Sequence, residues 1–425
     1  MRLIRPADAP RGGPVLSFIV LLRTSSQSMS SSSIETIAVH TGEHSDPNHP
    51  ASSPDLTMAS TFLMDTAEGF SINAFEDERP LMYTRWGNPT TLLLEKKLAA
   101  MESAEACLAL ASGMAATSTL LLGLLKSGDH VIVTPIHYPG TSELIRDLLP
   151  RFGISSSVVD PTDTAAIANA ITPATKMIWI ETPVNPTLAI TDIKACADIA
   201  KAHKIQLVVD STLATPIATR PIELGADFVV HSLTKYVGGH GDALGGCILG
   251  SKATLETLLS EAHVHYGGVI SPFNAWLIVR GIATLPIRMR QHEETAMQIA
   301  LFLDQHPEVA RVNYPGLPSH PQHDLAKQQM ANFGGLLSFQ AKNRKRLLKR
   351  LPRDFKLFHH AVSLGHVRSL ICYVDTEEVI SASYNLNSTQ QSAYRDWAGE
   401  GLFRISTGME NADELCEDIA NVLGN

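Results

Sequence analysis

The segment His231-Ser232-Leu233-Thr234-Lys235-Tyr236 directly follows a short apolar run, residues 228–230, and precedes a glycine-rich run, residues 238–246. A run that is short and uniformly apolar predicts a strand that is buried on both faces. Lys235 is therefore expected just beyond the carboxyl end of a strand. Open α/β sheets bind their ligands at that edge.

Strand-like and helix-like patterns alternate from about Thr90 to about Ser260. Apolar runs rich in β-branched residues predict further buried strands at residues 130–135, 177–180 and 205–209. Helical spacing of apolar residues occurs in three sets: Leu94, Leu98 and Met101; Ala116, Leu120 and Leu124; and Ile193, Cys196, Ala197 and Ala200. The alternation predicts an α/β fold whose largely parallel sheet is covered by helices on both faces.

The sequence divides into four predicted parts. Residues 1–33 form an N-terminal extension and residues 34–89 an irregular arm. Residues 90–286 form the α/β domain. Residues 287–425 form a smaller C-terminal α+β domain, in which we expect a helix at 293–304, strands at 335–339 and 403–405, and a final helix from Asn411.

The N-terminal extension allows two interpretations. Arg2, Arg5 and Arg11 precede a short apolar run, residues 15–22, and a serine-rich stretch follows, as in a signal or transit peptide. The apolar run is too short to span a bilayer, which takes about 20 residues. Because Met29 would serve equally well as a first residue, we expect a disordered extension or a start codon placed too early.

Composition narrows the class of protein. With 44% hydrophobic and 18% charged residues the chain is expected to be a well-packed enzyme. A net charge of −9 disfavours nucleic acid as a partner, and neither a membrane span nor a metal site is expected. The five cysteines are odd in number and include no C-x-x-C pair, which favours reduced thiols and a cytoplasmic location.

Three short features carry possible chemistry, and the first two involve Lys235 and Asp210. The Lys235 amine could condense with an aldehyde while the Ser232 and Thr234 hydroxyls bind a phosphate. A lone lysine in a polar turn is more often simply solvated. Asp210 ends the preceding strand, where its carboxylate could pair with a protonated pyridine nitrogen or merely cap the next turn.

The third feature is Ser112-Gly113-Met114-Ala115-Ala116, which opens a helix. Its free backbone amides would suit a phosphate, and Gly113 would let the backbone approach closely. An ordinary serine N-cap is the alternative. Each feature is weak alone, but one cofactor would explain all three.

Together these segments resemble the Cys/Met-metabolism family of pyridoxal-phosphate (PLP) enzymes, which includes cystathionine lyases and synthases, methionine γ-lyase and homoserine-ester sulfhydrylases. Matching segments run from Ser60-Thr61-Phe62 to residues 404–410. The resemblance implies the PLP-dependent transferase-like fold of the aspartate aminotransferase type. It further implies a sulfur amino acid as substrate and PLP as cofactor.

The resemblance assigns the cofactor contacts residue by residue. Ser232-Leu233-Thr234-Lys235-Tyr236 matches the lysine motif, so Lys235 would hold PLP as a Schiff base and shuttle protons. Ser232 and Thr234 would bind its phosphate together with the amides of Gly113 and Met114. Asp210 would pair with the pyridine nitrogen.

Further motifs imply ring and substrate contacts. Tyr138, in His137-Tyr138-Pro139-Gly140-Thr141, would stack on the ring. Residues 181–186 match E-[ST]-P-x-N-P and place Asn185 near cofactor and substrate. Arg404 would grip the substrate α-carboxylate through two parallel hydrogen bonds, and Ser363 would also contact substrate.

Residues 83–90 resemble the family motif Y-x-R-x-x-N-P-T. In the family this tyrosine and arginine reach the phosphate of a neighbouring subunit. Tyr83 and Arg85 therefore imply a homodimer or a homotetramer.

The branch of the family is less defined by the sequence. Val362, before Ser363-Leu364-Gly365, resembles methionine γ-lyases and sulfhydrylases, since cystathionine γ-synthases and γ-lyases tend to carry a glutamate there. The cysteine that methionine γ-lyases carry near the stacking tyrosine is Gly140. The family's S-L-G-G-x-E-S-L contains His366 and Arg368, which either favour an extra acidic group on the substrate or simply face solvent.

These observations lead to ranked functional hypotheses. The first is carbon–sulfur bond cleavage by γ-elimination from methionine, cystathionine or homocysteine. The alternative is γ-replacement, as in cystathionine γ-synthase or O-acylhomoserine sulfhydrylase, and a remote alternative is a non-catalytic protein on the same fold. A nicotinamide enzyme is disfavoured because no strand leads into G-x-G-x-x-G, and a metalloprotease because residues 292–296 lack the second histidine of H-E-x-x-H.

Overall fold

The computed structural model describes residues 32–43, 51–63, 81–160, 162–382, 384 and 386–424. The predicted extension, residues 1–33, lies outside the described residues except for its last two. The described residues form two sheets, one of seven strands and one of five. Among them no helix is long and apolar enough to cross a membrane.

The larger sheet has the strand order β1-β7-β6-β5-β4-β2-β3. Its strands are β1 (Ala106–Leu110), β2 (His130–Val133), β3 (Ser155–Val158), β4 (Thr175–Glu181), β5 (Gln206–Asp210), β6 (Phe228–Ser232) and β7 (Gly246–Gly250). The strands from β3 to β6 pair in parallel, whereas β7 is antiparallel to both β6 and β1. The prediction of a largely parallel sheet is therefore confirmed.

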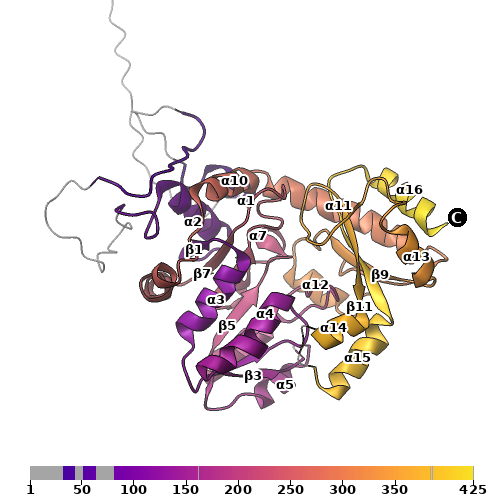
Figure 1. Ribbon diagram of the computed structural model, residues 1–425, viewed down its shortest axis with the longest axis horizontal. Coiled ribbons are helices and arrows are strands. Elements are labelled where there is room, and N and C mark those ends of the chain that lie inside the picture. Colours follow the sequence, from indigo (N-terminus) through magenta and orange to yellow (C-terminus); the bar gives the residue numbers. More distant parts are fainter. Residues whose placement is uncertain are drawn as a thin grey trace, which may run out of the picture. The chain divides into compact units, whose positions relative to one another are not determined.

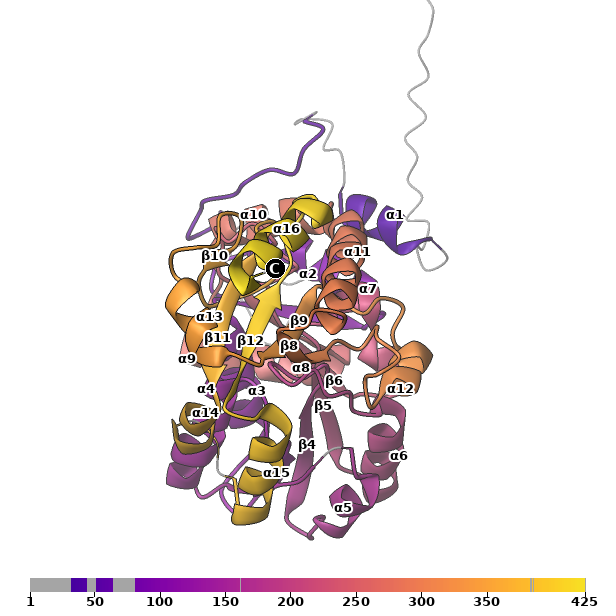
Figure 2. The same ribbon diagram turned by 90° about the vertical axis from the view of Figure 1, so that its right-hand side faces the viewer.

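Helices cover both faces of this sheet, because consecutive residues of each buried strand point to opposite faces. Val208 packs in one apolar cluster with Leu120 of α3 (Gly113–Leu124). Its neighbours Leu207 and Val209 pack in another cluster, with α6 (Ile193–His203). Figure 2 shows α3 and α4 (Pro139–Glu143) on one side of the strands and α5 (Thr164–Asn169) and α6 on the other.

The remaining helices connect and cover the two sheets. In the first part of the chain they are α1 (Ile34–His40), α2 (Pro89–Met101), η2 (Leu144–Leu148), η3 (Leu149–Phe152), α7 (Thr215–Ala218), η4 (Pro221–Leu224), α8 (Lys252–Leu258), η5 (Leu259–His263), α9 (Val264–Tyr266) and α10 (Pro272–Ile282). Later come α11 (Leu285–Asp304), α12 (His323–Gln329), α13 (Arg344–Arg350), α14 (Thr376–Ala382), α15 (Ser388–Ala398) and α16 (Ala412–Leu423). The predicted helix at 293–304 is the second part of α11, which begins earlier because Pro286 is tolerated in a first turn. The domain boundary at 286/287 stays a prediction.

The smaller sheet has the order β10-β11-β12-β9-β8. Its strands are β8 (Val309–Asn313), β9 (Leu336–Ala341), β10 (His359–His360), β11 (Leu370–Asp375) and β12 (Gly401–Ser406). Phe339 and Phe403 stack with ring centroids 5.4 Å apart and belong to the same apolar cluster as Leu347 of α13 and Ile419 of α16. Figure 1 shows α11 running past this sheet toward α13 and α16. The final helix has the predicted Asn411 as its N-cap.

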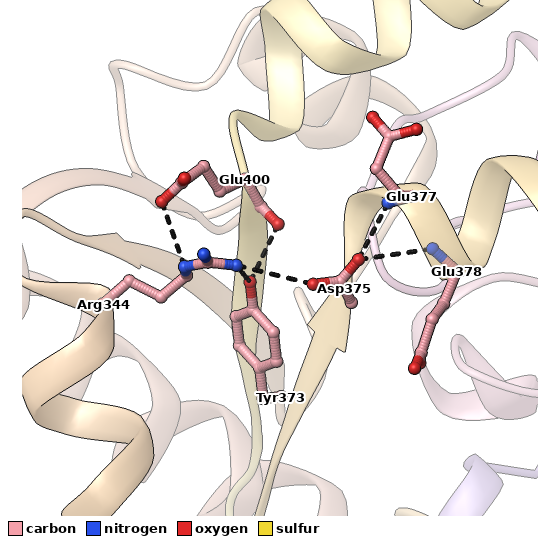
Figure 3. Close-up of polar contacts among 6 residues, drawn as sticks. All are labelled: Arg344, Tyr373, Asp375, Glu377, Glu378 and Glu400. Atoms are coloured by element: carbon pink, nitrogen blue, oxygen red, sulfur yellow. Dashed lines mark hydrogen bonds and ion pairs between the residues drawn. The ribbon is translucent and has the colours of Figure 1, made fainter.

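A polar cluster at the end of β11 joins six residues, shown in Figure 3: Arg344, Tyr373, Asp375, Glu377, Glu378 and Glu400. The Arg344 guanidinium donates to the Tyr373 hydroxyl (2.9 Å) and forms an ion pair with Glu400 (3.0 Å). Asp375 accepts from the amides at the start of α14, at 2.9 and 3.3 Å, and so caps that helix. These contacts fix α13 and α14 to the small sheet.

The five cysteines are free in the structure: four are buried and Cys416 is half-buried. None of the described His, Cys, Asp and Glu side chains form a group able to hold a metal ion.

Gly246, at the start of β7, lies against the backbone that leads from β1 into α3. A Cβ at this position would collide with the Ser112 carbonyl oxygen and lie 2.7 Å from the Gly113 nitrogen. We therefore expect Gly246→Ala to lower the free energy of unfolding by about 1–3 kcal/mol, because backbone must move to make room. Urea unfolding measures this. Gly268→Ala is the control, since its Cβ would meet only Ala115 at 3.2 Å and Leu110 at 3.9 Å; an equal loss in both variants would contradict the prediction.

Candidate active site

One cavity of about 440 Å³ lies beyond the carboxyl ends of β4, β5 and β6. Ten of the twelve residues that the sequence predicted for the site line it: Gly113, Met114, Tyr138, Asn185, Asp210, Ser232, Thr234, Lys235, Ser363 and Arg404. Lys235 and Asp210 thus face the same space. The remaining two, Tyr83 and Arg85, line a different hollow of the chain, together with Met58 and Pro272.

Strand register explains why distant residues meet here. Glu181, the last residue of β4, is the Cα partner of Asp210, the last residue of β5. Asp210 in turn pairs with Val230, two residues before Ser232 at the end of β6. Because parallel strands end at the same edge, carboxylates and hydroxyls that terminate them gather there.

Asp210 is held by Thr212, which the sequence analysis missed. Its Oδ1 accepts from the Thr212 amide (3.0 Å) and hydroxyl (2.6 Å), and that hydroxyl oxygen accepts from the Ser232 amide (2.9 Å). An aspartate two residues before a hydroxyl residue is a known turn signal, so this contact could have been anticipated. Burial raises the pKa of Asp210, and the Thr212 hydrogen bonds oppose that change.

Glu181 is a buried carboxyl group beside Asp210, and the sequence analysis missed its role. It accepts from the Tyr138 amide (2.6 Å) and from the Asn185 amide (3.1 Å) and so connects two loops of the site. Burial, followed by the neighbouring charge of Asp210, raises the pKa of Glu181 to about 8. At neutral pH the pair therefore favours a state in which Glu181 keeps its proton.

The start of α3 forms an anion site beside the end of β6. The Ser112 side chain caps the helix by accepting from the Ala115 amide (3.1 Å). The amides of Gly113 and Met114 belong to the first turn, where backbone amides have no carbonyl partner within the helix. A Cβ on Gly113 would lie 2.8 Å from the Ser232 Cβ, so only glycine allows this close approach. Helix amides and a serine hydroxyl at one point suit a phosphate.

Lys235 lines the cavity together with Ser363 and Arg404. Its Nζ donates to the Ser363 hydroxyl at 2.8 Å. Burial lowers the pKa of Lys235, and the positive charge of Arg404 lowers it further. A lysine amine with a lowered pKa is a better nucleophile and a better general base.

Arg404, on β12, is almost fully buried (8% exposed) and brings a positive charge to the cavity from the smaller sheet. It donates to the Asn185 side-chain oxygen (3.2 Å) and to the Ser363 carbonyl (2.6 Å). Its Nε is buried without a hydrogen bond among the described residues. A guanidinium with a donor left over suits a carboxylate ligand.

The residues present fit PLP. The Lys235 amine suits the aldehyde, the Asp210 carboxylate suits a protonated ring nitrogen, and the α3 amides with Ser232 and Thr234 suit the phosphate. The fold and this set of donors define a PLP-dependent enzyme of the transferase-like fold. The family model described as Cys/Met metabolism PLP-dependent enzyme matches residues 35–424, and the chain belongs to that family.

Known proteins similar to the chain agree with this assignment. Canavanine γ-lyase of Pseudomonas canavaninivorans is 39% identical over 405 residues, which cover 95% of this chain and 99% of that protein. L-methionine γ-lyase of Fusobacterium nucleatum subsp. polymorphum is 39% identical over 389 residues (90% and 96%). The crystal structure of cystathionine γ-lyase from Lactobacillus plantarum complexed with L-serine matches with a TM-score of 0.82 and 35% identity, covering 92% of this chain and 98% of that one. Relatives at this level of identity carry both lyase and synthase names.

The raised pKa of Glu181 predicts a pH effect on stability. In the cofactor-free protein the folded state keeps a proton on Glu181 that the unfolded chain releases above its ordinary pKa of 4.5. Glu181 therefore makes the free energy of unfolding fall as pH rises from 4.5 to about 8. Because an amide does not titrate, Glu181→Gln should make this fall shallower by up to about 1 kcal/mol per pH unit.

Urea unfolding of the cofactor-free protein at several pH values measures this effect. Glu417→Gln, at an exposed carboxylate of α16, serves as the matched control. Parallel pH profiles for Glu181→Gln and the unsubstituted protein would show that Glu181 is charged when folded.

Proposed function

We propose that the protein cleaves a carbon–sulfur bond of a sulfur amino acid, methionine, cystathionine or homocysteine, by γ-elimination. The observation that carries the proposal is that the Lys235 amine, the Asp210 carboxylate and the Arg404 guanidinium line one cavity. When bound, PLP supplies an electron sink that stabilises negative charge on the substrate carbons next to the amino group. Lys235, Asp210, Ser232, Thr234 and the amides of Gly113 and Met114 would hold it, with Tyr138 against its ring.

The remaining steps belong to the chain's own residues. Arg404 binds the substrate α-carboxylate, and Asn185 fixes the guanidinium by accepting from it at 3.2 Å. Lys235 takes the proton from the α-carbon and then delivers a proton to a neighbouring carbon of the substrate. The lowered pKa of Lys235 favours the first step, because a larger fraction of the amine is unprotonated and can act as a base. Asp210, whose carboxylate is held by the Thr212 hydroxyl, would pair with the ring nitrogen of bound PLP.

The mouth of the cavity supports a substrate with an uncharged side chain. Val362 is 80% exposed and Leu244 is 58% exposed, and both line the cavity. Among the three proposed substrates, apolar side chains at this position favour methionine and homocysteine over cystathionine, whose leaving group carries a second ammonium and a second carboxylate. The names of the similar γ-lyases agree with elimination at the γ-carbon.

The packing around Gly140 explains why this chain has glycine where methionine γ-lyases carry a cysteine. A Cβ at Gly140 would lie 2.8 Å from the Tyr138 ring and 3.0 Å from the Met114 sulfur. The tyrosine ring and the methionine therefore occupy the space that a larger residue would need. We infer that this chain places its ring-stacking tyrosine without the assistance of that cysteine.

Removal of the lysine amine tests the catalytic proposal. Purified protein should be yellow with bound PLP, and Lys235→Ala should lose that absorbance and at least about 10³-fold of its activity, since it lacks both the covalent anchor and the base. The assay supplies methionine, cystathionine, homocysteine, or O-acylhomoserine with sulfide. 2-Oxobutyrate from any of the first three agrees with the proposal. Pyruvate from cystathionine would overturn γ-elimination, homocysteine from the acyl ester would favour γ-replacement, and a colourless protein would favour a non-catalytic role.

We also propose that two copies of the chain complete each active site. Tyr83 and Arg85 lie outside the cavity of their own chain, and Tyr83 is 46% exposed. The Arg85 guanidinium lies 5.5 Å from the Tyr83 ring centroid and donates to the Val264 carbonyl (3.0 Å), so the pair is presented together. In a dimer, or in a tetramer of two dimers, they would contact the phosphate of the PLP bound to the partner copy.

We further propose a cytoplasmic location, which the free cysteines support.

A mixed dimer tests the shared site. Lys235→Ala and Arg85→Ala proteins should each be nearly inactive, but a hybrid of one copy of each holds one complete site. Random reassembly of equal amounts should therefore recover about a quarter of the unsubstituted activity. The control reassembles Lys235→Ala with Asp210→Ala. Both residues line the cavity of their own chain, so in the hybrid each of the two sites lacks one of them and neither site is complete. Equal recovery from both mixtures, or none from the first, would contradict a site shared between copies.

A further inference from the structure

His366 stands where the family motif S-L-G-G has a second glycine, and the fold brings it to the lysine. Its loop is tied to the glycine-rich segment after Lys235 by the Val367 amide, which donates to the Gly239 carbonyl (2.9 Å). The imidazole packs on Gly241, where a Cβ would lie 2.8 Å from the ring. A histidine at this position therefore has a defined place rather than a free surface rotamer.

A chain of hydrogen bonds connects the imidazole to the lysine amine. The Lys235 Nζ donates to the Ser363 Oγ at 2.8 Å, and that Oγ lies 3.4 Å from the His366 Nε2. Because the amine donates to the serine oxygen, the serine hydrogen is free to point at an unprotonated Nε2. Hydrogen bonds in such a chain strengthen one another.

Ser363 is held rigidly in this arrangement. Its φ of +87° is unusual for a residue with a side chain. The Arg404 guanidinium donates to its carbonyl at 2.6 Å, and the next glycine, Gly365, donates to the Ser406 hydroxyl at 2.9 Å. Strained backbone maintained by such contacts often marks a functional residue.

Burial and the charges that face His366 favour the neutral form of its ring. Burial lowers its pKa most, Lys235 and Arg368 lower it further, and Asp242 on the glycine-rich segment opposes them. A neutral imidazole can accept a hydrogen bond at Nε2, whereas a protonated one cannot.

We propose that His366 is a positioning residue for Lys235, which orients the Ser363 hydroxyl by accepting its hydrogen and thereby sets the proton affinity of the amine. The inference rests on the proposed role of Lys235 as the base. Recognition of an acidic group on the substrate is less consistent with the structure, because His366 and Arg368 are not among the described residues that line the cavity.

Histidine modification by diethyl pyrocarbonate tests the coupling without any substrate. The reagent attacks neutral imidazole, so its rate against pH reports the pKa of each histidine. Trypsin, which cleaves after Lys356 and Arg368, releases one peptide that contains His359, His360 and His366. The first two are exposed and provide internal controls in the same peptide, read by tandem mass spectrometry.

In full-length protein stripped of PLP, Lys235→Met should raise the modification midpoint of His366 by roughly half a pH unit or more, because a neighbouring positive charge is removed. The midpoints of His359 and His360 should stay unchanged. An unchanged midpoint for His366, or an equal shift in all three, overturns the coupling. Because no turnover is measured, this result is independent of which reaction the enzyme catalyses.

Two substitutions of His366 separate positioning from packing, assayed with PLP bound and with the substrate found above. His366→Gly restores the family residue, removes the acceptor, and should lower kcat about three- to tenfold with little change in KM. His366→Gln places an oxygen near the position of Nε2 and should restore kcat at neutral pH, but without the acidic inflection that His366 titration adds to the pH profile. His360→Gln is the control and should match the unsubstituted protein. A raised KM at unchanged kcat in the glycine variant, or an acidic inflection retained in the glutamine variant, overturns the proposal.

Discussion

Two carboxyl groups, the buried Glu181 and the half-buried Asp210, end neighbouring parallel strands and lie side by side at the carboxyl edge of the larger sheet. Burial makes two adjacent negative charges costly, so one proton is retained, and the raised pKa of Glu181 places it there. Asp210 is then the carboxyl group left to carry a negative charge, which a protonated ring nitrogen could neutralise. The sheet register thus places negative charge at this edge, where a cationic cofactor ring would neutralise it.

The same edge organises the rest of the cavity. Glu181 accepts hydrogen bonds from the loops that carry Tyr138 and Asn185, and Asn185 contacts Arg404 from the smaller sheet. The larger sheet therefore supplies the groups suited to the cofactor, and the smaller sheet supplies the group suited to the substrate carboxylate. A displacement of either sheet would separate Arg404 from Asn185, so substrate binding depends on how the two parts pack.

Sequence patterns were sufficient where burial left a uniform signature. The apolar, β-branched runs of β2, β4, β5 and β6 are recognisable because both faces of each strand are covered. By contrast, β3 (Ser155–Val158) is mostly serine and lacks that signature, and β1 and β7 contain alanine, glycine and leucine that fit a helix or a strand. Motifs located ten lining residues, but the contacts of Thr212 and Glu181 follow from turn geometry and strand register, which linear spacing does not contain.

The departures of this chain from its family's motifs are physically connected. Gly140 leaves room for the Tyr138 ring and the Met114 sulfur, while His366 fills a position that the family leaves to glycine. Both changes lie beside residues assigned to the cofactor, and neither replaces one of them. Groups that carry out the chemistry are constrained by the geometry of the reaction, whereas groups that hold them are constrained only by fit and charge. Changes in the supporting groups can alter the proton affinity of Lys235 or the orientation of Tyr138 without changing which bonds are broken. Such changes provide a physical route by which one family serves different sulfur amino acids.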